Sequence, residues 1–378
     1  MRLALLLFKY FPHGGLQRNF RRITELCLER GHAVDVFTLA WEGWDPAHPG
    51  LQIERVKVGG WRNHVRYRQF AEAVQPRLKR GSYDRVVGFN KLPGLDVYYN
   101  ADPCLMHRAT HRSWLYRRSA RFKQLAAFEQ AVFAANARNH ILLLSPAEQP
   151  LFQHWYNTRP DRFRPMPPYV SADRFVPSDY AERRQRMRAE LGLTDDERLL
   201  LMVGSDYRRK GVDRAVRALA GLPEEQRHRS QLYVLGKGQP GPIQRLARRL
   251  GVADRVHLLQ GRDDVPEFLF AADLLLHVAY QENTGTAIVE AIAAGLPTLV
   301  TGNCGYAAHV TAADCGQVVP EPFQQDALNQ ALREMLDSEQ AQYWRANARQ
   351  YAADTELGNR AEHAVRVIEG PKYGEGAE

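Results

Sequence analysis

Short apolar runs alternate with segments of helical periodicity along most of this chain. The runs are rich in Val and Leu and span Leu3–Phe8, Val34–Leu39, Arg85–Phe89, Ile141–Ser145, Leu199–Gly204, Leu232–Gly236, Val256–Leu259, Leu274–Val278 and Thr298–Thr301. Continuous apolar runs of this length are typical of parallel strands buried on both faces. Two series of such runs, with helices between the strands, predict an α/β protein with two doubly wound, Rossmann-like domains.

A proline-rich segment separates the two series. Three of the five residues in Arg164–Pro168 are prolines, which donate no backbone hydrogen bond and favour extended chain. The 378 residues also exceed the roughly 250–300 at which single cores stop growing. We therefore predict one domain over 1–167 and a second over 168–351.

Three helical segments follow the last strand of the second series. They are Gln324–Leu336, Glu339–Asp354 and Glu356–Ile368. The last lies far beyond its sheet, so we expect a C-terminal helical extension, about 352–378, that packs back on the first domain.

The charge balance indicates an anionic partner. Lys and Arg total 51 against 43 Asp and Glu, a formal net charge of +8. Nucleic acid, a membrane surface and a phosphorylated small molecule all fit such an excess.

Cysteine spacing and hydropathy exclude other classes. Cys27, Cys104, Cys304 and Cys315 are scattered, unlike the ligands of a zinc site or the pairs of a disulfide framework. No apolar run approaches the roughly 20 residues of a membrane-spanning helix, and the apolar start lacks the cleavage site of a signal peptide. We expect a cytoplasmic protein with peripheral membrane contact at most.

Two loops after predicted strands could bind an anion. Gly14 and Gly15 follow the first strand, where paired glycines allow close approach to a ligand or simply form a tight turn. Arg208, Arg209 and Lys210 follow Leu199–Gly204, at a strand end where open α/β sheets bind ligands. Guanidinium and ammonium groups there favour a diphosphate site over a solvated basic loop.

Two glutamates lie eight residues apart after the strand Leu274–Val278. Glu282 precedes Gly285, which we expect at a helix N-terminus, and Glu290 lies about one and a half turns into that helix. Glu282 could reach a ligand hydroxyl group, and Glu290 could accept hydrogen bonds from a ribose diol. A capping glutamate and a glutamate on the helix surface are the alternative, but apolar neighbours predict a largely buried helix.

This Glu-x7-Glu spacing resembles the motif of the retaining nucleotide-sugar glycosyltransferases of family 4, which have the GT-B fold of two facing Rossmann-like domains. Within that family the chain is similar to lipopolysaccharide core glucosyltransferases over nearly its full length. The similarity is densest at Lys9–Phe20, Arg30–His32, Trp41–Gly43, Asp84–Tyr99, Val203–Arg214, Ala271–Glu282, Gly295–Pro297 and Cys304–Tyr306.

The resemblance implies transfer of a hexose, glucose or a related sugar, from a UDP-sugar to a heptose of the lipopolysaccharide inner core. It implies retention at the anomeric carbon, no metal or other cofactor, and a place on the cytoplasmic face of the inner membrane. The sequence has no Asp-x-Asp triplet of the kind that holds Mg²⁺ or Mn²⁺ on a diphosphate. Arg209 and Lys210 would then neutralise the leaving UDP, whose phosphate helps to deprotonate the acceptor hydroxyl.

The resemblance also assigns site residues. It implies catalytic roles for Glu282, Asp102 and Lys210; Asp102 is the acidic candidate near the acceptor because Asn19 stands where an acid is common. The donor site that it implies consists of Gly15, Arg174, Arg209, Lys210, Arg262, Asn283, Thr284, Gly285 and Glu290. Asn283 and Thr284 are more polar than usual in this loop, so a UDP-GalNAc or UDP-GlcNAc donor stays open.

Most of the excess charge lies in segment 104–133. Six cations face one acid, Glu129, and alternate with aromatic residues, which is typical of a helix lying in a membrane surface. The predicted membrane residues are Arg108, Arg112, Trp114, Tyr116, Arg117, Arg118, Arg121 and Lys123. A half-buried helix with core aromatics and solvated arginines is the alternative.

Two other functions stay open. A UDP-sugar epimerase or phosphorylase on the same fold would act without a lipid acceptor. A basic nucleic-acid-binding protein would be retained on DNA in a salt-sensitive way, although no known module for nucleic acid is present and we expect no such partner.

Overall fold

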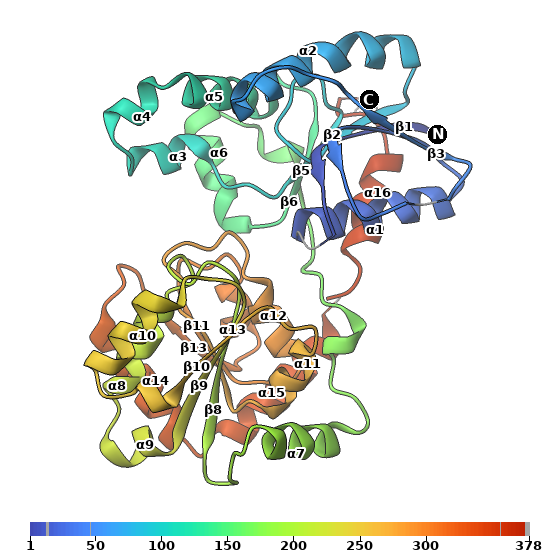
Figure 1. The fold of residues 1–378 in the computed structure, drawn as a ribbon. Helices are drawn as coiled ribbons and strands as arrows, with labels where there is room; N and C mark the ends of the chain where they lie inside the picture. Colours follow the sequence, from blue (N-terminus) through green and yellow to red (C-terminus); the bar gives the residue numbers. More distant parts are fainter. Residues whose placement is uncertain (13–14, 46, 356, 375–378) are drawn as a thin grey trace. The chain divides into compact units, whose positions relative to one another are not determined.

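The computed structural model describes residues 1–12, 15–45, 47–355 and 357–374 (Figure 1). Contacts divide the chain into two units, Met1–Pro167 with Asn359–Glu378, and Pro168–Gly358. The second unit therefore ends at Gly358 rather than at 351. Its last residues stay with it because the Val170 N–H donates a 2.6 Å hydrogen bond to the carbonyl oxygen of Leu357.

The first unit contains one parallel sheet of seven strands in the order β3-β2-β1-β4-β5-β6-β7. The strands are β1 (Arg2–Tyr10), β2 (Ala33–Trp41), β3 (Leu51–Arg55), β4 (Arg85–Gly88), β5 (Val97–Asn100), β6 (His140–Leu143) and β7 (Phe163–Pro165). Pattern analysis found β1, β2, β4 and β6. It missed β3, which is largely exposed and polar, the four-residue strand β5, and β7, which has three residues and ends in a proline.

Helices cover both faces of this sheet. Successive residues of β1 enter two different cores: Leu5 packs in a cluster with α1 and α16, and Leu6 in a cluster with α2 and α5. The helices are α1 (Gly15–Glu29), α2 (Asn63–Gly81), α3 (Leu105–Thr110), α4 (Trp114–Arg118), α5 (Ala120–Phe133), α6 (Gln149–Tyr156) and α16 (Arg360–Glu369), with short 3₁₀ turns at Pro146–Glu148 and Pro160–Arg162.

The helix that returns to the first unit is α16, shorter than the expected extension over 352–378. It packs on α1 through Val365 and Ile368, and Arg30 beyond α1 pairs with Glu369 at 2.6 Å. Glu356, where the expected helix begins, and residues 375–378 lie outside the described residues.

The second unit contains a parallel sheet of six strands in the order β10-β9-β8-β11-β12-β13. The strands are β8 (Arg198–Val203), β9 (Ser230–Leu235), β10 (Val256–Leu259), β11 (Leu274–His277), β12 (Thr298–Thr301) and β13 (Gly316–Val319). Its helices are α7 (Tyr180–Glu190), α8 (Val212–Ala220), α9 (Glu224–His228), α10 (Pro240–Arg249), α11 (Val265–Ala271), α12 (Thr286–Ala293), α13 (Ala307–Ala312), α14 (Gln325–Asp337) and α15 (Ala341–Asp354), with 3₁₀ turns at Ala172–Arg174 and Ala253–Arg255. Leu200 and Leu201 of β8 point into different clusters, so both faces of this sheet are covered too.

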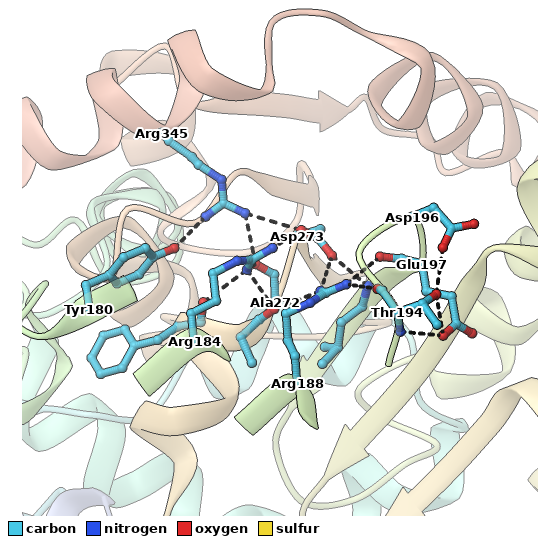
Figure 2. A network of polar contacts seen from close by, with 12 residues as sticks. Tyr180, Arg184, Arg188, Thr194, Asp196, Glu197, Ala272, Asp273 and Arg345 are labelled. Carbon is cyan, nitrogen blue, oxygen red and sulfur yellow. Dashed lines mark hydrogen bonds and ion pairs between the residues drawn. The ribbon is translucent and has the colours of Figure 1, made fainter. Parts of the chain in front are cut away.

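Arginine side chains form a network of polar contacts at the amino end of β11 (Figure 2). Asp273 pairs with Arg184 at 2.6 Å and with Arg188 at 3.0 Å, and Arg345 of α15 donates to the Ala272 carbonyl at 2.9 Å. Burial opposes ionisation of Asp273, but these guanidinium groups lower its pKa overall. The network ties α7 and α15 to the sheet at the edge opposite the strands' carboxyl ends.

The strand order reverses at one point in each sheet, between β1 and β4 in the first and between β8 and β11 in the second. Chains leaving adjacent strands there run in opposite directions, which opens a crevice at the carboxyl ends and is where α/β sheets bind ligands. Among the described residues, no helix combines the length and apolar character that crossing a bilayer requires.

Candidate active site

The loops that leave β8 and β11 meet at the reversal point of the second sheet. The first carries Arg209 and Lys210, and the second carries Glu282. The Lys210 ammonium contacts the Glu282 carboxylate, and Arg209 Nη1 lies 3.1 Å from Glu282 Oε2. The side chains of Lys210 and Glu282 are only 13% and 11% exposed, so their charges are poorly screened by solvent. The sequence singled out all three residues, and the structure brings them together.

Direct backbone contact holds these two loops against each other. Gly211 has a φ of +71°, and a Cβ atom at this position would lie 2.1 Å from the carbonyl oxygen of Val278. Two residues before Gly211, the carbonyl oxygen of Arg209 accepts a 2.9 Å hydrogen bond from the Tyr280 N–H. Only glycine permits this approach, which sets the spacing between Lys210 and Glu282.

Two polar side chains that sequence reasoning missed fix the loop after β11. Arg214 is buried between the rings of Tyr280 and Phe323, and its Nη1 donates to the Ala279 carbonyl at 2.9 Å. Asn303 donates from Nδ2 to the carbonyls of Ala279 and Tyr280, at 3.1 and 3.0 Å. An arginine three residues beyond a glycine gives no local signal of this role, since its partners lie far along the chain.

A buried histidine, also missed, lies beside Glu282. His277 ends β11, and its Nε2 is 3.6 Å from Glu282 Oε2. Burial lowers the pKa of His277. Burial opposes the charge of Glu282 too, but the His277 ring and the Lys210 ammonium outweigh it and hold the pKa of Glu282 well below its usual range. Glu282 is therefore ionised at neutral pH and accepts hydrogen bonds; it is not a proton donor. The sequence signal that could have identified His277 is its position as a polar residue at the end of the apolar strand β11.

The second glutamate, Glu290, lies in α12, the helix that follows the same loop. Gly285, with a φ of +87°, is the N-cap residue of α12, which places Glu290 within the helix as predicted. Glu290 lies 4.0 Å from Arg174, measured between Oε1 and Nε. Arg174 Nη1 also lies 3.4 Å from Asp173 Oδ2, and the buried Nε and Nη1 atoms make no hydrogen bond to the described residues. The half-buried Asn283 and Thr284 connect Glu282 to Gly285.

The remaining predicted residues lie apart from this cluster. Arg262 follows β10, two strands away from β8, and its guanidinium is bound by Asp264, with Nε 2.7 Å from Oδ1. Gly15 is the first residue of α1 in the other unit, and apart from its chain neighbours no described residue has an atom within 4 Å of its Cβ position. His13 and Gly14 of the predicted glycine turn lie outside the described residues.

Asp102 follows β5 in the first unit and lines a pocket of about 370 Å³, called here the inner pocket. Phe8 of β1, Asn90 and Lys91 after β4, and Arg108 and Arg121 also line it. The inner pocket therefore lies at the carboxyl ends of the strands where the first sheet reverses its order. Lys91 contributes little net charge there because it pairs with the buried carboxylate of Glu129.

The basic segment forms three helices, α3, α4 and α5, and not the single helix expected. Three of its aromatic residues are core: Phe122, Phe128 and Phe133 are buried, as the structural alternative predicts. Trp114 and Leu115 are 56% and 62% exposed. The six cations are exposed as well: Arg108, Arg112, Arg117, Arg118, Arg121 and Lys123, whereas Tyr116 is half-buried.

Side chains that could bind a metal ion are scattered in the described parts of the chain. Within the described ranges, no three His, Cys, Asp or Glu side chains gather in a group that could hold a metal ion. The four cysteines are buried and unpaired with one another.

Comparison with known proteins places the chain in a family. The sequence pattern of the family described as glycosyl transferases group 1 matches residues 183–351. The lipopolysaccharide glucosyltransferase WaaG of Escherichia coli K12 is 44% identical over 372 residues, which are 98% of this chain and 99% of that protein. A D-inositol 3-phosphate glycosyltransferase of Streptomyces scabiei is 34% identical over 171 residues, 42% of this chain and 37% of that protein.

Solved structures agree with the sequence relatives. A crystal structure of WaaG matches with a TM-score of 0.87 and 43% identity, and covers 98% of this chain and 100% of that one. Sucrose-phosphate synthase of Thermosynechococcus elongatus matches with a TM-score of 0.76 over 97% of each chain, at 21% identity, and shows the fold alone. With two Rossmann-like units of the GT-B type, this chain belongs to the WaaG family of glycosyltransferases.

Proposed function

We propose that this glycosyltransferase moves a hexose, glucose or a related sugar, from a UDP-sugar to a heptose of the lipopolysaccharide inner core, with retention and without a metal ion. The observation that carries the proposal is the 44% identity, over 98% of the chain, to a protein named lipopolysaccharide glucosyltransferase. Family membership also favours sugar transfer over epimerisation and over binding of nucleic acid.

The cluster at the β8–β11 reversal point supports a nucleotide-sugar donor. Arg209 and Lys210 carry the positive charge that a departing diphosphate needs, and solvent screens the charge of the buried Lys210 only weakly. When a diphosphate takes these cations, the ionised Glu282 becomes free to accept hydrogen bonds from hydroxyl groups of the sugar. Arg174 and Glu290 then provide an anion contact and a ribose contact beside it.

The chemistry that we infer needs no protein nucleophile. The acceptor hydroxyl oxygen attacks the anomeric carbon from the side on which UDP leaves, and the bond from that carbon to the β-phosphate oxygen breaks. Its electron pair stays on the phosphate, and the hydroxyl proton passes to the same phosphate. Lys210 stabilises the negative charge that develops on this phosphate, and Asp102 orients the acceptor sugar.

The exposed half of the basic segment supports a peripheral place on an anionic, cytoplasmic membrane surface. Trp114 is exposed with the Arg118 guanidinium 4.6 Å from its ring centre, and Arg117 and Lys123 are exposed nearby. Tryptophan and basic residues are the groups that bind the headgroup region of anionic lipid.

The decisive experiment incubates the protein with truncated lipopolysaccharide and, in turn, UDP-glucose, UDP-galactose, UDP-GlcNAc and UDP-GalNAc. We expect the acceptor mass to rise by one hexose with UDP-glucose, and the new linkage to keep the donor's anomeric configuration by NMR. A gain of an N-acetylhexosamine would instead select the alternative donors. Consumption of the donor with no change in any acceptor would support the epimerase or phosphorylase alternative and overturn the proposal.

Membrane binding is tested separately, by sedimentation with phosphatidylglycerol-containing and purely zwitterionic vesicles. Arg117→Gln with Arg118→Gln should weaken sedimentation with the anionic vesicles only. The matched control is Arg248→Gln with Arg249→Gln, which removes the same charge from the exposed end of α10. An equal loss of sedimentation in both double variants would show that the effect depends on net charge alone.

A further inference from the structure

A second pocket of the first unit is lined by arginines. It has a volume of about 620 Å³ and is called here the basic pocket. Arg108 of α3, Arg112 between α3 and α4, and Arg121 of α5 line it, together with His111 and Tyr116. No described residue that lines it carries a carboxylate. Three like charges around one concave surface repel each other, so the pocket favours an anion.

Among the described residues, the three arginines have no acidic partner. In the part of the chain that the structure describes, no ion pair or side-chain hydrogen bond links Arg108, Arg112 or Arg121 to another residue. This differs from arginines with a structural role, such as Arg183, whose Nε lies 3.1 Å from both carboxylate oxygens of Glu267. Guanidinium groups present up to five donors each, which suit phosphate or carboxylate oxygens.

The basic pocket adjoins the inner pocket that contains Asp102. Arg108 and Arg121 line both pockets, as do Leu105 and Leu125. A molecule that places an anionic group between these two arginines would therefore extend its neighbouring atoms toward Asp102. The helices that build this arrangement, α3, α4 and α5, lie together in the first unit (Figure 1).

The other cations of the segment do not line the basic pocket. Arg117, Arg118 and Lys123 are absent from its walls, and Arg118 lies over the exposed ring of Trp114. The cations thus divide into three that line a concave site and three that present to an outer surface. This division gives two variants of equal charge change in one short segment.

We propose that the basic pocket binds an anionic substituent of the acceptor, a phosphate monoester or a sugar carboxylate, and so positions the acceptor sugar beside Asp102. The proposal rests on the proposed function, because it takes the acceptor to be a charged glycolipid core. It assigns Arg108, Arg112 and Arg121 to the acceptor rather than to the bilayer. The concave shape and the shared wall with the inner pocket favour this source of anion over a lipid headgroup.

The test uses Arg108→Gln with Arg112→Gln, and Arg117→Gln with Arg118→Gln as the matched control. The acceptor is a core oligosaccharide released from its lipid, so that membrane binding plays no part. It is supplied intact, dephosphorylated, or with its carboxylates reduced. We expect the first variant to raise the KM for the intact oligosaccharide at least tenfold, equivalent to about 1.4 kcal/mol, and to leave the KM for the UDP-sugar unchanged. The control should match the wild type.

The chemically altered acceptors identify the group that binds. For the wild-type protein, the KM should rise by the same factor on whichever acceptor lacks the bound group. For the first variant, removal of that group should raise the KM no further. Wild-type kinetics in the first variant, or an equal loss in the control, would overturn the proposal. Weaker binding of the first variant to anionic vesicles, with unchanged kinetics on the soluble acceptor, would assign the pocket to lipid headgroups instead.

A binding measurement separates failure of this proposal from failure of the proposed function. The intact oligosaccharide is titrated calorimetrically into protein saturated with UDP. Binding to wild type that the first variant loses supports the basic pocket even if no sugar is transferred. Equal binding to both proteins refutes it, while transfer by the wild type would leave the proposed function standing.

Discussion

Replacing Gly211 by Ala tests whether the contact between the two site loops positions Lys210 against Glu282. Gly211 adopts a φ of +71°, which costs a residue with a Cβ atom about 1–2 kcal/mol. The new Cβ would also lie 2.1 Å from the Val278 carbonyl oxygen, whereas ordinary contact begins at 3.4 Å. The loops must therefore separate by about 1.3 Å, and a misplacement of about 1 Å can reduce the rate about 100-fold.

Gly251→Ala is the matched control. Gly251 has nearly the same φ, +70°, and apart from its chain neighbours no atom of the described residues lies within 4 Å of its Cβ position. It carries the same backbone cost without the clash, so we expect a loss of about 1–2 kcal/mol, seen as a fall in Tm of roughly 2–8 °C, and unchanged turnover.

The assay measures turnover with UDP-glucose and truncated lipopolysaccharide, at a temperature where calorimetry shows both variants to be folded. Gly211→Ala should have a lower Tm than Gly251→Ala and a turnover about 100-fold below it. Equal turnover in the two variants would refute a role of the Val278 contact in positioning Lys210 against Glu282.

Three further predictions concern charge. Glu282→Gln removes the counter-charge of Lys210 and Arg209, so it should lower the Tm and the turnover but keep or improve the affinity for UDP measured by calorimetry. The control is Glu334→Gln at an exposed position, and weaker UDP binding by Glu282→Gln would contradict the proposed role of the two cations. Because cations and not a metal are proposed to neutralise the leaving UDP, activity should survive EDTA, and strict dependence on added Mn²⁺ would refute this. Burial lowers the pKa of four histidines from the ordinary value of 6.5: His140, His257, His277 and His309. Below about pH 6.5 the unfolded state therefore binds more protons than the folded state, so the Tm should fall as the pH is lowered from 7.5 to 5.5, and a constant Tm would contradict this prediction.

Local pattern was enough to predict the class of fold and to select three residues of the candidate active site. Apolar runs such as Leu199–Gly204 and Leu274–Val278 identify buried parallel strands because a strand covered on both faces is apolar at nearly every position, which is visible within a few residues. Loops that follow such strands are the places where ligands bind, so Arg209, Lys210 and Glu282 could be selected before their contact was known. The prolines of Arg164–Pro168 marked the boundary that contacts place at Pro167.

Features that depend on distant partners were out of reach of local pattern. Lys210 meets Glu282 across 72 residues of sequence, and Arg214 holds a loop that begins 64 residues later, so neither contact has a signal in its own neighbourhood. The aromatic residues of segment 104–133 show the same limit: Phe122 and Trp114 read alike along the chain, yet one is buried and the other exposed. Side-chain chemistry and strand period are local properties, whereas burial and pairing are decided by which elements pack together.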